Sequence, residues 1–398
     1  MTVMLFDSLL NLKELDVSEN NMNSDNLVGI DKLVSLKKLN LRSCNLTRLP
    51  FSFDSLTNLT ELDISCNKLD LNSLASISRL KLLEKINLSS CELTELSFRF
   101  SSLINLQELD VSGNKLSRYF LDDIDQLLLL EKLNLSSCNL KNLPFRFASL
   151  SNLKELDVSY NKLHRYSLDE IDRLTLLEKL NLKSCDLEEL LFRCIACEVM
   201  KEAHARTLAS LTNLRHLDIS CNKLSRYSLK EIDQMVSLRN LNLSSCGLTN
   251  LPFRFASLTK LKELDLSCNE LGQYSLDDMD PLVLLEKLNM SYCGLTNLPL
   301  SFEKLGKLKT LLLKGNKFEK FPSVLRSLPQ HPYVDIADTD LSQELSTKEL
   351  LFQELLNSGE QKIDLSRRLV CIVRTRQIVN VEFGWLRWCE LGAQVKLA

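Results

Sequence analysis

The amino-acid sequence predicts an α/β solenoid of about thirteen stacked coils, with a parallel β-sheet on the concave face and short helices, 3-10 turns and extended segments on the convex face. Three observations predict this fold. Nearly the whole chain consists of copies of one stretch, residues 106–152. Apolar residues recur at fixed positions within each copy, and the copies follow one another at a nearly constant spacing. An array of this kind grows without closing a single core.

Each half of residues 106–152 has apolar residues at positions 1, 4, 6 and 11 and a small polar residue at position 9. In the first half, Leu106 is position 1, Asn114 is position 9 and Leu116 is position 11; in the second half, Cys138 is position 9. The pattern is L-x-x-L-x-L-x-x-N/C-x-L. On these residues the chain resembles intracellular leucine-rich-repeat proteins, and the resemblance implies the solenoid fold.

The repeats alternate between 24 and 23 residues, apart from one interval of 37 residues. They start at Leu12, Leu36, Leu59, Leu83, Leu106, Leu130, Leu153, Leu177, Leu214, Leu238, Leu261, Leu285 and Leu308. We predict one repeat domain over residues 1–330. Residues 6–11 (FDSLLN) copy the end of a repeat at residues 53–58 (FDSLTN). We therefore expect either that the array of the natural protein extends further N-terminally or that Met1 is an artefact of the gene model.

The two repeat types differ on the predicted convex side. The 24-residue type carries S-x-x-E/D patterns, which favour short helices, at Ser167, Ser228 and Ser275. The 23-residue type carries Leu-Pro-Phe-Arg-Phe at residues 143–147 and 251–255, where proline favours an extended or 3-10 connection. Phenylalanines that recur once per pair of repeats predict a spine in the core: Phe53, Phe100, Phe147, Phe255 and Phe302.

Composition argues against several classes of partner and compartment. The net charge of -3 gives no reason to expect nucleic acid or an anionic membrane as a partner. No segment has the apolar length of a signal peptide or a membrane span. Asn-x-Ser/Thr sequons at Asn87, Asn134 and Asn242 begin within predicted strands, where glycans would block the concave face. We therefore expect a soluble, cytoplasmic protein.

Cysteine usage favours the same compartment. Neighbours in the position-9 column should lie roughly 10 Å apart, which is beyond disulfide reach, so we expect a ladder of free thiols. The column consists of Cys44, Cys91, Cys138, Cys185, Cys246 and Cys293.

Residues 194–207 (CIACEVMKEAHART) are a fourteen-residue insertion into one repeat. Cys194, Cys197 and His204 suggest a metal site, but a zinc site of this type needs a second cysteine pair, and none follows. We predict a lengthened convex loop or an extra helical turn here, with no metal and no cofactor.

Residues 331–398 predict a C-terminal extension with a helix at 346–357 and a strand at 369–373. This order resembles the start of the Ras-like GTPase domain in Roc-COR leucine-rich-repeat GTPases. Such a domain needs G-x-x-x-x-G-K-S/T directly after the strand, where this chain reads RTRQIVN. The resemblance implies an alternative in which the chain is the sensor half of such a protein, without its nucleotide-binding domain.

The predicted concave face carries positions 3, 5 and 7 of each repeat. Position 3 alternates Glu and Lys, so that Glu108 and Glu155 each have a lysine on both sides in a checkerboard of charge. Position 5 is Asp in the longer repeats and Asn in the shorter ones. Either the checkerboard only sets repeat register and solubility, or the Asp stripe, which we expect to be unpaired, recognises a basic partner. The stripe comprises Asp63, Asp110, Asp157, Asp218 and Asp265.

Three other residues are candidates for partner contact. Tyr160 and Tyr292, both at position 8, are the aromatic residues expected near this face. His216 replaces the usual Glu at position 3, and we expect a solvated substitution. None of the four histidines lies in a motif with a nucleophile and a carboxylate, so we do not expect an enzyme.

The Leu-Pro-x-x-Phe repeats are similar to those of cytoplasmic Ras-pathway scaffolds and plant Ras-group-related leucine-rich-repeat proteins, over about residues 6–330. This resemblance implies a role in intracellular signalling. We expect a non-catalytic scaffold whose concave face binds a protein partner, with the sensor half of a GTPase as one alternative. The other alternative, a fragment of an extracellular receptor, requires an upstream signal peptide and paired cysteine caps.

Overall fold

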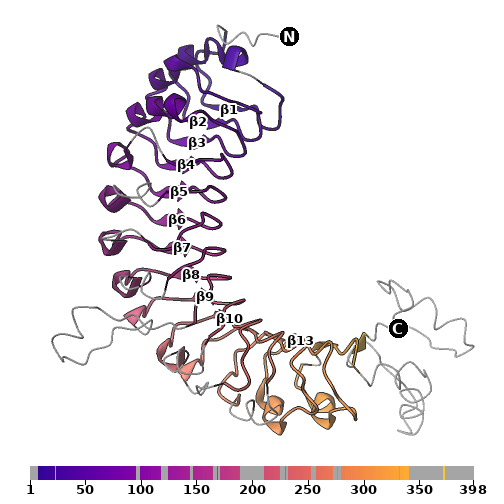
Figure 1. The fold of residues 1–398 in the computed structure, drawn as a ribbon. Coiled ribbons are helices and arrows are strands. Elements are labelled where there is room, and N and C mark those ends of the chain that lie inside the picture. The colour runs from indigo at the N-terminus through magenta and orange to yellow at the C-terminus, as the bar shows by residue number, and fades with distance from the viewer. Residues whose placement is uncertain are drawn as a thin grey trace, which may run out of the picture.

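The computed structural model describes residues 8–22, 24–95, 99–117, 124–143, 147–164, 168, 171–188, 210–224, 229, 232–251, 257–271, 276, 279–330, 332–339 and 371–372. In this part of the chain, the strands lie along the inner side of an arc and the helices lie along its outer side (Figure 1). The predicted curved solenoid with a concave parallel sheet is therefore confirmed.

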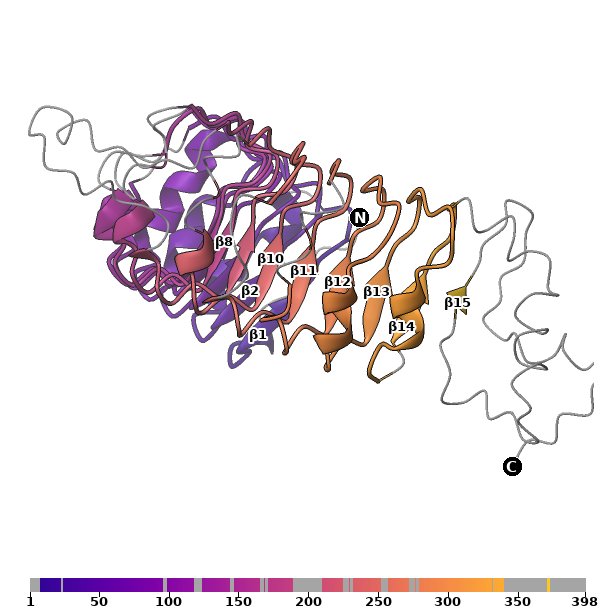
Figure 2. The ribbon, with the colours of Figure 1, turned by 90° about the horizontal axis from the view of Figure 1, so that it is seen from below.

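One parallel sheet contains every strand of the described residues, in chain order. Figure 2 shows the later strands following one another from β10 to β14. The strands are β1 (Glu14–Asp16), β2 (Lys38–Asn40), β3 (Glu61–Asp63), β4 (Lys85–Asn87), β5 (Glu108–Asp110), β6 (Lys132–Asn134), β7 (Glu155–Asp157), β8 (Lys179–Asn181), β9 (His216–Asp218), β10 (Asn240–Asn242), β11 (Glu263–Asp265), β12 (Lys287–Asn289), β13 (Thr310–Leu312), β14 (Tyr333–Asp335) and β15 (Cys371–Ile372). Equal positions pair across neighbouring repeats, as in Glu61 opposite Lys85.

The sheet continues past residue 330, where the sequence predicts the end of the repeat domain. β14 pairs with β13 through Val334 and Leu311, and β15 pairs with β14 through Cys371 and Val334. The buried side chain of Val334 joins the same core as the repeats before it. Residues 371–372 of the strand predicted at 369–373 are thus strand in the same sheet, whereas the helix predicted at 346–357 and the insertion at 194–207 lie outside the described residues.

The helices of the described convex side are all of the 3-10 type. They are η2 (Ser24–Leu27), η3 (Ile30–Lys32), η4 (Phe51–Ser55), η5 (Leu71–Arg79), η6 (Phe100–Ser102), η7 (Ile124–Gln126), η8 (Phe147–Ser149), η9 (Ile171–Arg173), η11 (Ile232–Gln234), η14 (Leu300–Lys304) and η15 (Ser323–Arg326). In the 23-residue type, η4 and η14 start directly after Pro50 and Pro299, in agreement with the predicted effect of proline. The predicted capping serines Ser167, Ser228 and Ser275 lie outside the described residues.

The core is one column of leucines, running the length of the array between the sheet and the outer helices. Phe53, Phe147 and Phe302 are fully buried in this column, which confirms these three members of the predicted spine. The side chains of Phe100 and Phe255 are not among those that the structure describes. Burial of each large apolar side chain contributes about 1.5–3 kcal/mol, so packing rather than strand length holds these three-residue strands in place.

Position 9 of the longer repeats is a buried asparagine that closes the turn of the preceding coil. The Oδ1 atom of Asn67 accepts hydrogen bonds from the backbone N–H groups of Cys44 (3.1 Å) and Leu46 (2.9 Å). Its Nδ2 atom donates to the carbonyl of Leu41 (2.9 Å) in that preceding coil and to Ile64 in its own coil. The same contacts recur at Asn114, Asn161, Asn222, Asn269 and Asn316.

Position 9 of the shorter repeats is a buried cysteine. The Cys138 thiol donates to the carbonyl of Val111 in the preceding longer repeat (3.2 Å), and burial raises the pKa of this thiol to about 12. All six cysteines of the column are buried and free, as predicted. The boundaries between coils therefore alternate: asparagine joins each longer repeat to the shorter one before it, and cysteine joins each shorter repeat to the longer one before it.

Candidate protein-binding surface

The concave face forms one groove of about 1140 Å³, lined from Glu14 of β1 to Asn289 of β12. Side chains at positions 3 and 5 line its surface, and leucines at position 4 form a buried floor, as at Leu109, which is 2% exposed. This alternation follows from the two-residue period of a β-strand, which turns successive side chains to opposite faces. The groove is therefore polar along its walls and closed underneath by the core.

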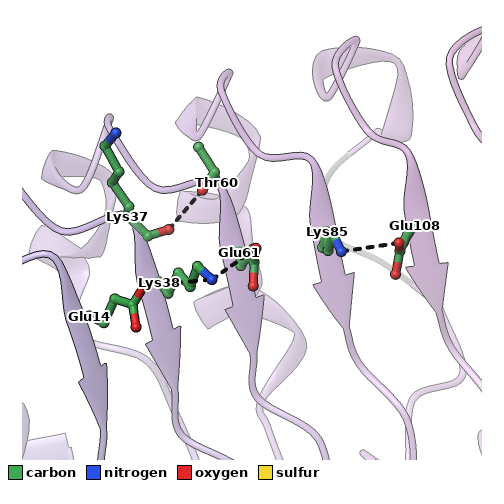
Figure 3. Close-up of polar contacts among 7 residues, drawn as sticks. All are labelled: Glu14, Lys37, Lys38, Thr60, Glu61, Lys85 and Glu108. Carbon is green, nitrogen blue, oxygen red and sulfur yellow. Dashed lines mark hydrogen bonds and ion pairs between the residues drawn. The ribbon is translucent and has the colours of Figure 1, made fainter.

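The checkerboard of charge predicted at position 3 is present. Lys38 Nζ lies 3.5 Å from the carboxylates of both Glu14 and Glu61, on the strands to either side (Figure 3). Glu108 likewise accepts from Lys85 at 3.1 Å and from Lys132 at 3.2 Å.

The Glu108 carboxyl shows how these contacts act on a charged group. Burial raises the pKa of Glu108, but hydrogen bonds from Lys85 and Lys132 outweigh burial, so its pKa is lower than usual. Glu155 has a similar partner in Lys179, whose Nζ lies 3.1 Å from its carboxylate. The Glu108 carboxylate is thus held ionised by its two lysine neighbours.

A second row of charges lies at position 2, directly before each strand, and we call it the rim row. Lys154 pairs with Glu131 at 2.7 Å and Lys262 pairs with Glu286 at 3.2 Å. Pairs in both rows are partly exposed to solvent, so each contributes only about 0–1 kcal/mol to folding.

The carboxylates of the Asp stripe make no ion pair with the described residues, but each is hydrogen-bonded to neutral neighbours. Asp110 Oδ1 accepts hydrogen bonds from the backbone N–H (2.9 Å) and the hydroxyl (2.6 Å) of Ser112, and its Oδ2 accepts from Asn134 Nδ2 (3.0 Å). The asparagine reaches the carboxylate because Asp110 and Asn134 are in register on β5 and β6. The same three bonds form at Asp63, Asp157, Asp218 and Asp265. Since a carboxylate offers about four acceptor sites, each Asp keeps one further acceptor site.

Both candidate tyrosines lie beside a lysine of the following coil. Tyr160 is 53% exposed, and Lys183 Nζ lies 5.5 Å from the centroid of its ring. Tyr292 is 48% exposed, and Lys314 Nζ lies 5.8 Å from its ring centroid. The Lys183 ammonium donates a hydrogen bond to the Tyr160 hydroxyl, which raises the pKa of Lys183 and keeps that ammonium charged.

These two lysines were missed in the sequence, although a signal was present. Lys183 and Lys314 occupy position 7, which is serine in most repeats, and each follows a repeat with tyrosine at position 8. Tyrosine at position 8 and lysine at position 7 occur together because the position-8 ring of one coil lies against the position-7 side chain of the next coil. Exposed tyrosine beside a cation is a composition common at binding hot spots.

His216 lies half-buried in β9, between Lys179 of β8 and Asn240 of β10. Burial lowers its pKa, and the positive charges of Lys179 and Arg239 act in the same direction. The expected solvated substitution is therefore only partly solvated, and the imidazole is neutral at pH 7.

In the part of the chain that the structure describes, no group of three or more His, Cys, Asp or Glu side chains could hold a metal ion. None of the helices in this part has the length and apolar character needed to cross a bilayer. Cys194, Cys197 and His204 lie outside this part.

Stacked coils with one strand each and a single sheet in chain order define a solenoid repeat protein. Family models give the type of repeat. The model described as "Leucine rich repeat" matches residues 144–187 and 199–248, and a two-copy leucine-rich-repeat model matches residues 34–76 and 236–280. A third leucine-rich-repeat model matches residues 105–127 and 284–305. The chain is a leucine-rich repeat protein.

Solved structures agree with this assignment, whereas a search of curated proteins found no match. A leucine-rich-repeat protein of Leptospira interrogans is 26% identical, with a TM-score of 0.64 over 92% of this chain and 91% of that one. The functional domain of InlJ from Listeria monocytogenes, which includes a cysteine ladder, is 23% identical, with a TM-score of 0.61 over 84% and 66%.

An extracellular protein is also among the similar structures. The leucine-rich-repeat ectodomain of the plant membrane receptor kinase GASSHO1/SCHENGEN3 from Arabidopsis thaliana, solved in complex with CASPARIAN STRIP INTEGRITY FACTOR 2, is 25% identical. Its TM-score is 0.57, over 83% of this chain and 42% of that one. The similarity to Ras-pathway scaffolds and to Roc-COR GTPases stays a prediction.

Proposed function

We propose that this protein is a non-catalytic scaffold of intracellular signalling, and that its concave groove binds a protein partner. The observation that carries the proposal is the continuity of the groove across β1 to β12. At about 4.8 Å per strand, these strands extend over about 50 Å. A groove of this length with charged walls suits a protein surface better than a small ligand, whose sites are typically enclosed and apolar.

Contacts in the groove favour a cytoplasmic protein over the extracellular alternative. The sequon asparagines Asn87, Asn134 and Asn242 each donate Nδ2 to an aspartate of the Asp stripe, at 3.0–3.1 Å. A glycan on any of these nitrogen atoms would occupy the groove and disturb that bond. The similarity to a receptor ectodomain supports the extracellular alternative. Glycosidase treatment of the native protein separates the two, because only a glycosylated, secreted form would lose mass.

The test of the proposal is affinity purification from native lysate with the wild-type protein and an Asp63/Asp110/Asp157/Asp218→Asn variant. Asparagine fits position 5, since Asn87 Oδ1 accepts from the Ser89 N–H (3.0 Å) as the aspartates do in their own repeats. The substitutions therefore remove charge and retain the local turn.

A variant with four Asp→Asn substitutions on the convex side serves as the matched control, at Asp25, Asp31, Asp54 and Asp125. We expect the concave variant to lose partners that the convex variant retains, with similar thermal stability for both. Retention of every partner by the concave variant would refute binding through the Asp stripe.

A further inference from the structure

The charge pattern of the groove is interrupted at β9 and β10. Position 3 alternates Glu and Lys from β1 to β8, but β9 has His216 and β10 has Asn240, paired in register. Lys179 of β8 consequently has the carboxylate of Glu155 on one side and a neutral imidazole on the other. No carboxylate lies at position 3 between β7 and β11.

The rim row changes at the same strands. Arg215, Arg239 and Lys262 occupy position 2 of three consecutive repeats, and their backbones are hydrogen-bonded in sequence at 2.8 and 2.7 Å. The two outer members pair with carboxylates further out: Arg215 with Glu178 at 3.0 Å, and Lys262 with Glu286 at 3.2 Å.

Arg239, in the middle, is exposed and has cations on both sides. Within the described ranges of the chain, its guanidinium makes no ion pair. At position 3 from β1 to β8, as at Lys38 and Glu108, the charges of neighbouring coils offset one another, whereas positive charge is left over at Arg239.

His216 reports the sign of the local field. Burial is the largest cause of the lowered pKa of His216. Among the nearby charges, Lys179, Arg239 and Arg215 lower this pKa further, and together they outweigh Glu263, which raises it. The environment of the imidazole is thus positive on balance, in agreement with the distribution of charges along β8 to β11.

We propose that Arg215, His216 and Arg239, which we call the cationic cluster, bind an acidic segment of the partner protein. The inference rests on the proposed function of the groove and adds the chemistry of the partner. An exposed guanidinium without an ion pair is suited to a bidentate contact with a carboxylate, which is among the stronger hydrogen-bonded pairs in proteins.

The neighbouring charges favour a peptide over a nucleic acid. Asp218 and Asp265, at position 5 of β9 and β11, line the groove two residues beyond position 3. A phosphate backbone would place further negative charge beside these carboxylates, whereas a peptide can present an acidic residue to Arg239 and a neutral or basic residue to Asp218.

Tyr160 and Tyr292 lie two coils to either side of the cationic cluster, on the repeats of β7 and β12. The five strand spacings between them amount to about 24 Å. The exceptions to the repeat pattern therefore bracket a single stretch of the concave face, of the size that one partner surface covers.

The test uses the full-length protein and a fluorescein-labelled octapeptide of alternating glutamate and serine, followed by fluorescence anisotropy at two salt concentrations. One variant, His216→Glu/Asn240→Lys, restores the Glu/Lys alternation without changing the net charge at pH 7. A second variant, Arg239→Gln, removes the guanidinium that makes no ion pair with the described residues. We expect each variant to bind the peptide at least about tenfold more weakly than wild type, the loss associated with one charge-assisted bond. Arg79→Gln on the convex side is the matched control, and we expect it to bind like wild type.

An NMR titration of His216 gives a second readout, with its signal assigned from its loss in the double variant. We expect saturation with the peptide to raise the pKa of His216, because a bound carboxylate stabilises the imidazolium. Absence of peptide binding to wild type, equal binding by Arg239→Gln, an unchanged His216 pKa, or tighter binding of an octameric single-stranded RNA would each overturn the inference.

The two proposals fail in different ways. If lysate partners are lost from the concave Asp variant but retained by His216→Glu/Asn240→Lys, partner binding by the cationic cluster is refuted and partner binding by the groove is supported. If the concave Asp variant keeps every partner, binding through the Asp stripe is refuted, whatever the peptide does.

Discussion

Substitution of the buried asparagine Asn161 by alanine should destabilise one boundary between coils. Asn161 is 1% exposed, and its Oδ1 accepts from the backbone N–H groups of Cys138 (3.0 Å) and Leu140 (2.9 Å). Alanine would leave both buried N–H groups without an acceptor. Each such group costs about 1–3 kcal/mol, so we expect Asn161→Ala to cost about 2–6 kcal/mol at this boundary.

Hydrogen exchange is the suitable assay, because the stability of a repeat array is distributed over its coils and a single unfolding free energy does not describe it. We expect protection of the amides in residues 135–141 to fall at least about thirtyfold, the equivalent of 2 kcal/mol. The matched control is Asn152→Ala, which removes one exposed bond, from Nδ2 to the carbonyl of Leu128 (2.7 Å). Equal loss of protection in both variants would show that burial of the amide is not what matters.

Three further predictions follow from contacts of single residues. Under native conditions, iodoacetamide should modify the exposed thiols of Cys221 and Cys268 but none of the six buried position-9 thiols until denaturant is added; early modification of the buried thiols, detected by peptide mass spectrometry, would contradict the ladder. Glu108→Gln should cost about 0–1 kcal/mol at pH 7. The pKa of Glu108 is lower in the folded protein than its unfolded value of about 4.3. The contribution of its carboxylate to the free energy of unfolding is therefore present above about pH 4.3 and is lost as the pH falls through the folded pKa. The unfolding free energies of wild type and variant, measured by urea titration, should thus converge in acid. Gly315→Ala should displace the Tyr292 ring, since a Cβ atom there would overlap the ring. Gly294→Ala, at a similar positive φ with nothing within 4 Å, should not displace a ring; equal tyrosine NMR shifts in both variants would refute this.

Regular repetition explains why so much of the fold could be predicted. The residue at position 4 is apolar in every repeat, so the register of the sheet follows from aligning the copies, and Glu61 pairs with Lys85 as expected. The cysteine column was predictable for the same reason, because equal positions in successive coils must lie on one line. The convex side was less predictable. The prolines predicted the start of η4, but no repeat pattern predicted that η5 would extend to nine residues.

The candidate site was predictable only where a residue acts through its position in the repeat. Position in the repeat placed Asp110 on the concave face, but it did not predict the Ser112 and Asn134 bonds, because these depend on how far each side chain reaches between coils. Arg239 was missed for a related reason. Its importance comes from the cations on the two neighbouring coils, which lie 24 and 23 residues away in the chain.

The alternation between asparagine and cysteine at position 9 also determines how the array would respond to a pulling force. A boundary held by a buried amide, such as that of Asn161, has three buried hydrogen bonds across it from that one side chain. A boundary with Cys138 has one weak thiol bond and one partly exposed bond, from Asn134 to Asp110. Tension would therefore part the coils at the cysteine boundaries first. The pieces released would each contain a shorter repeat followed by a longer one, so the mechanical unit is displaced by one coil from the unit that is copied in the sequence.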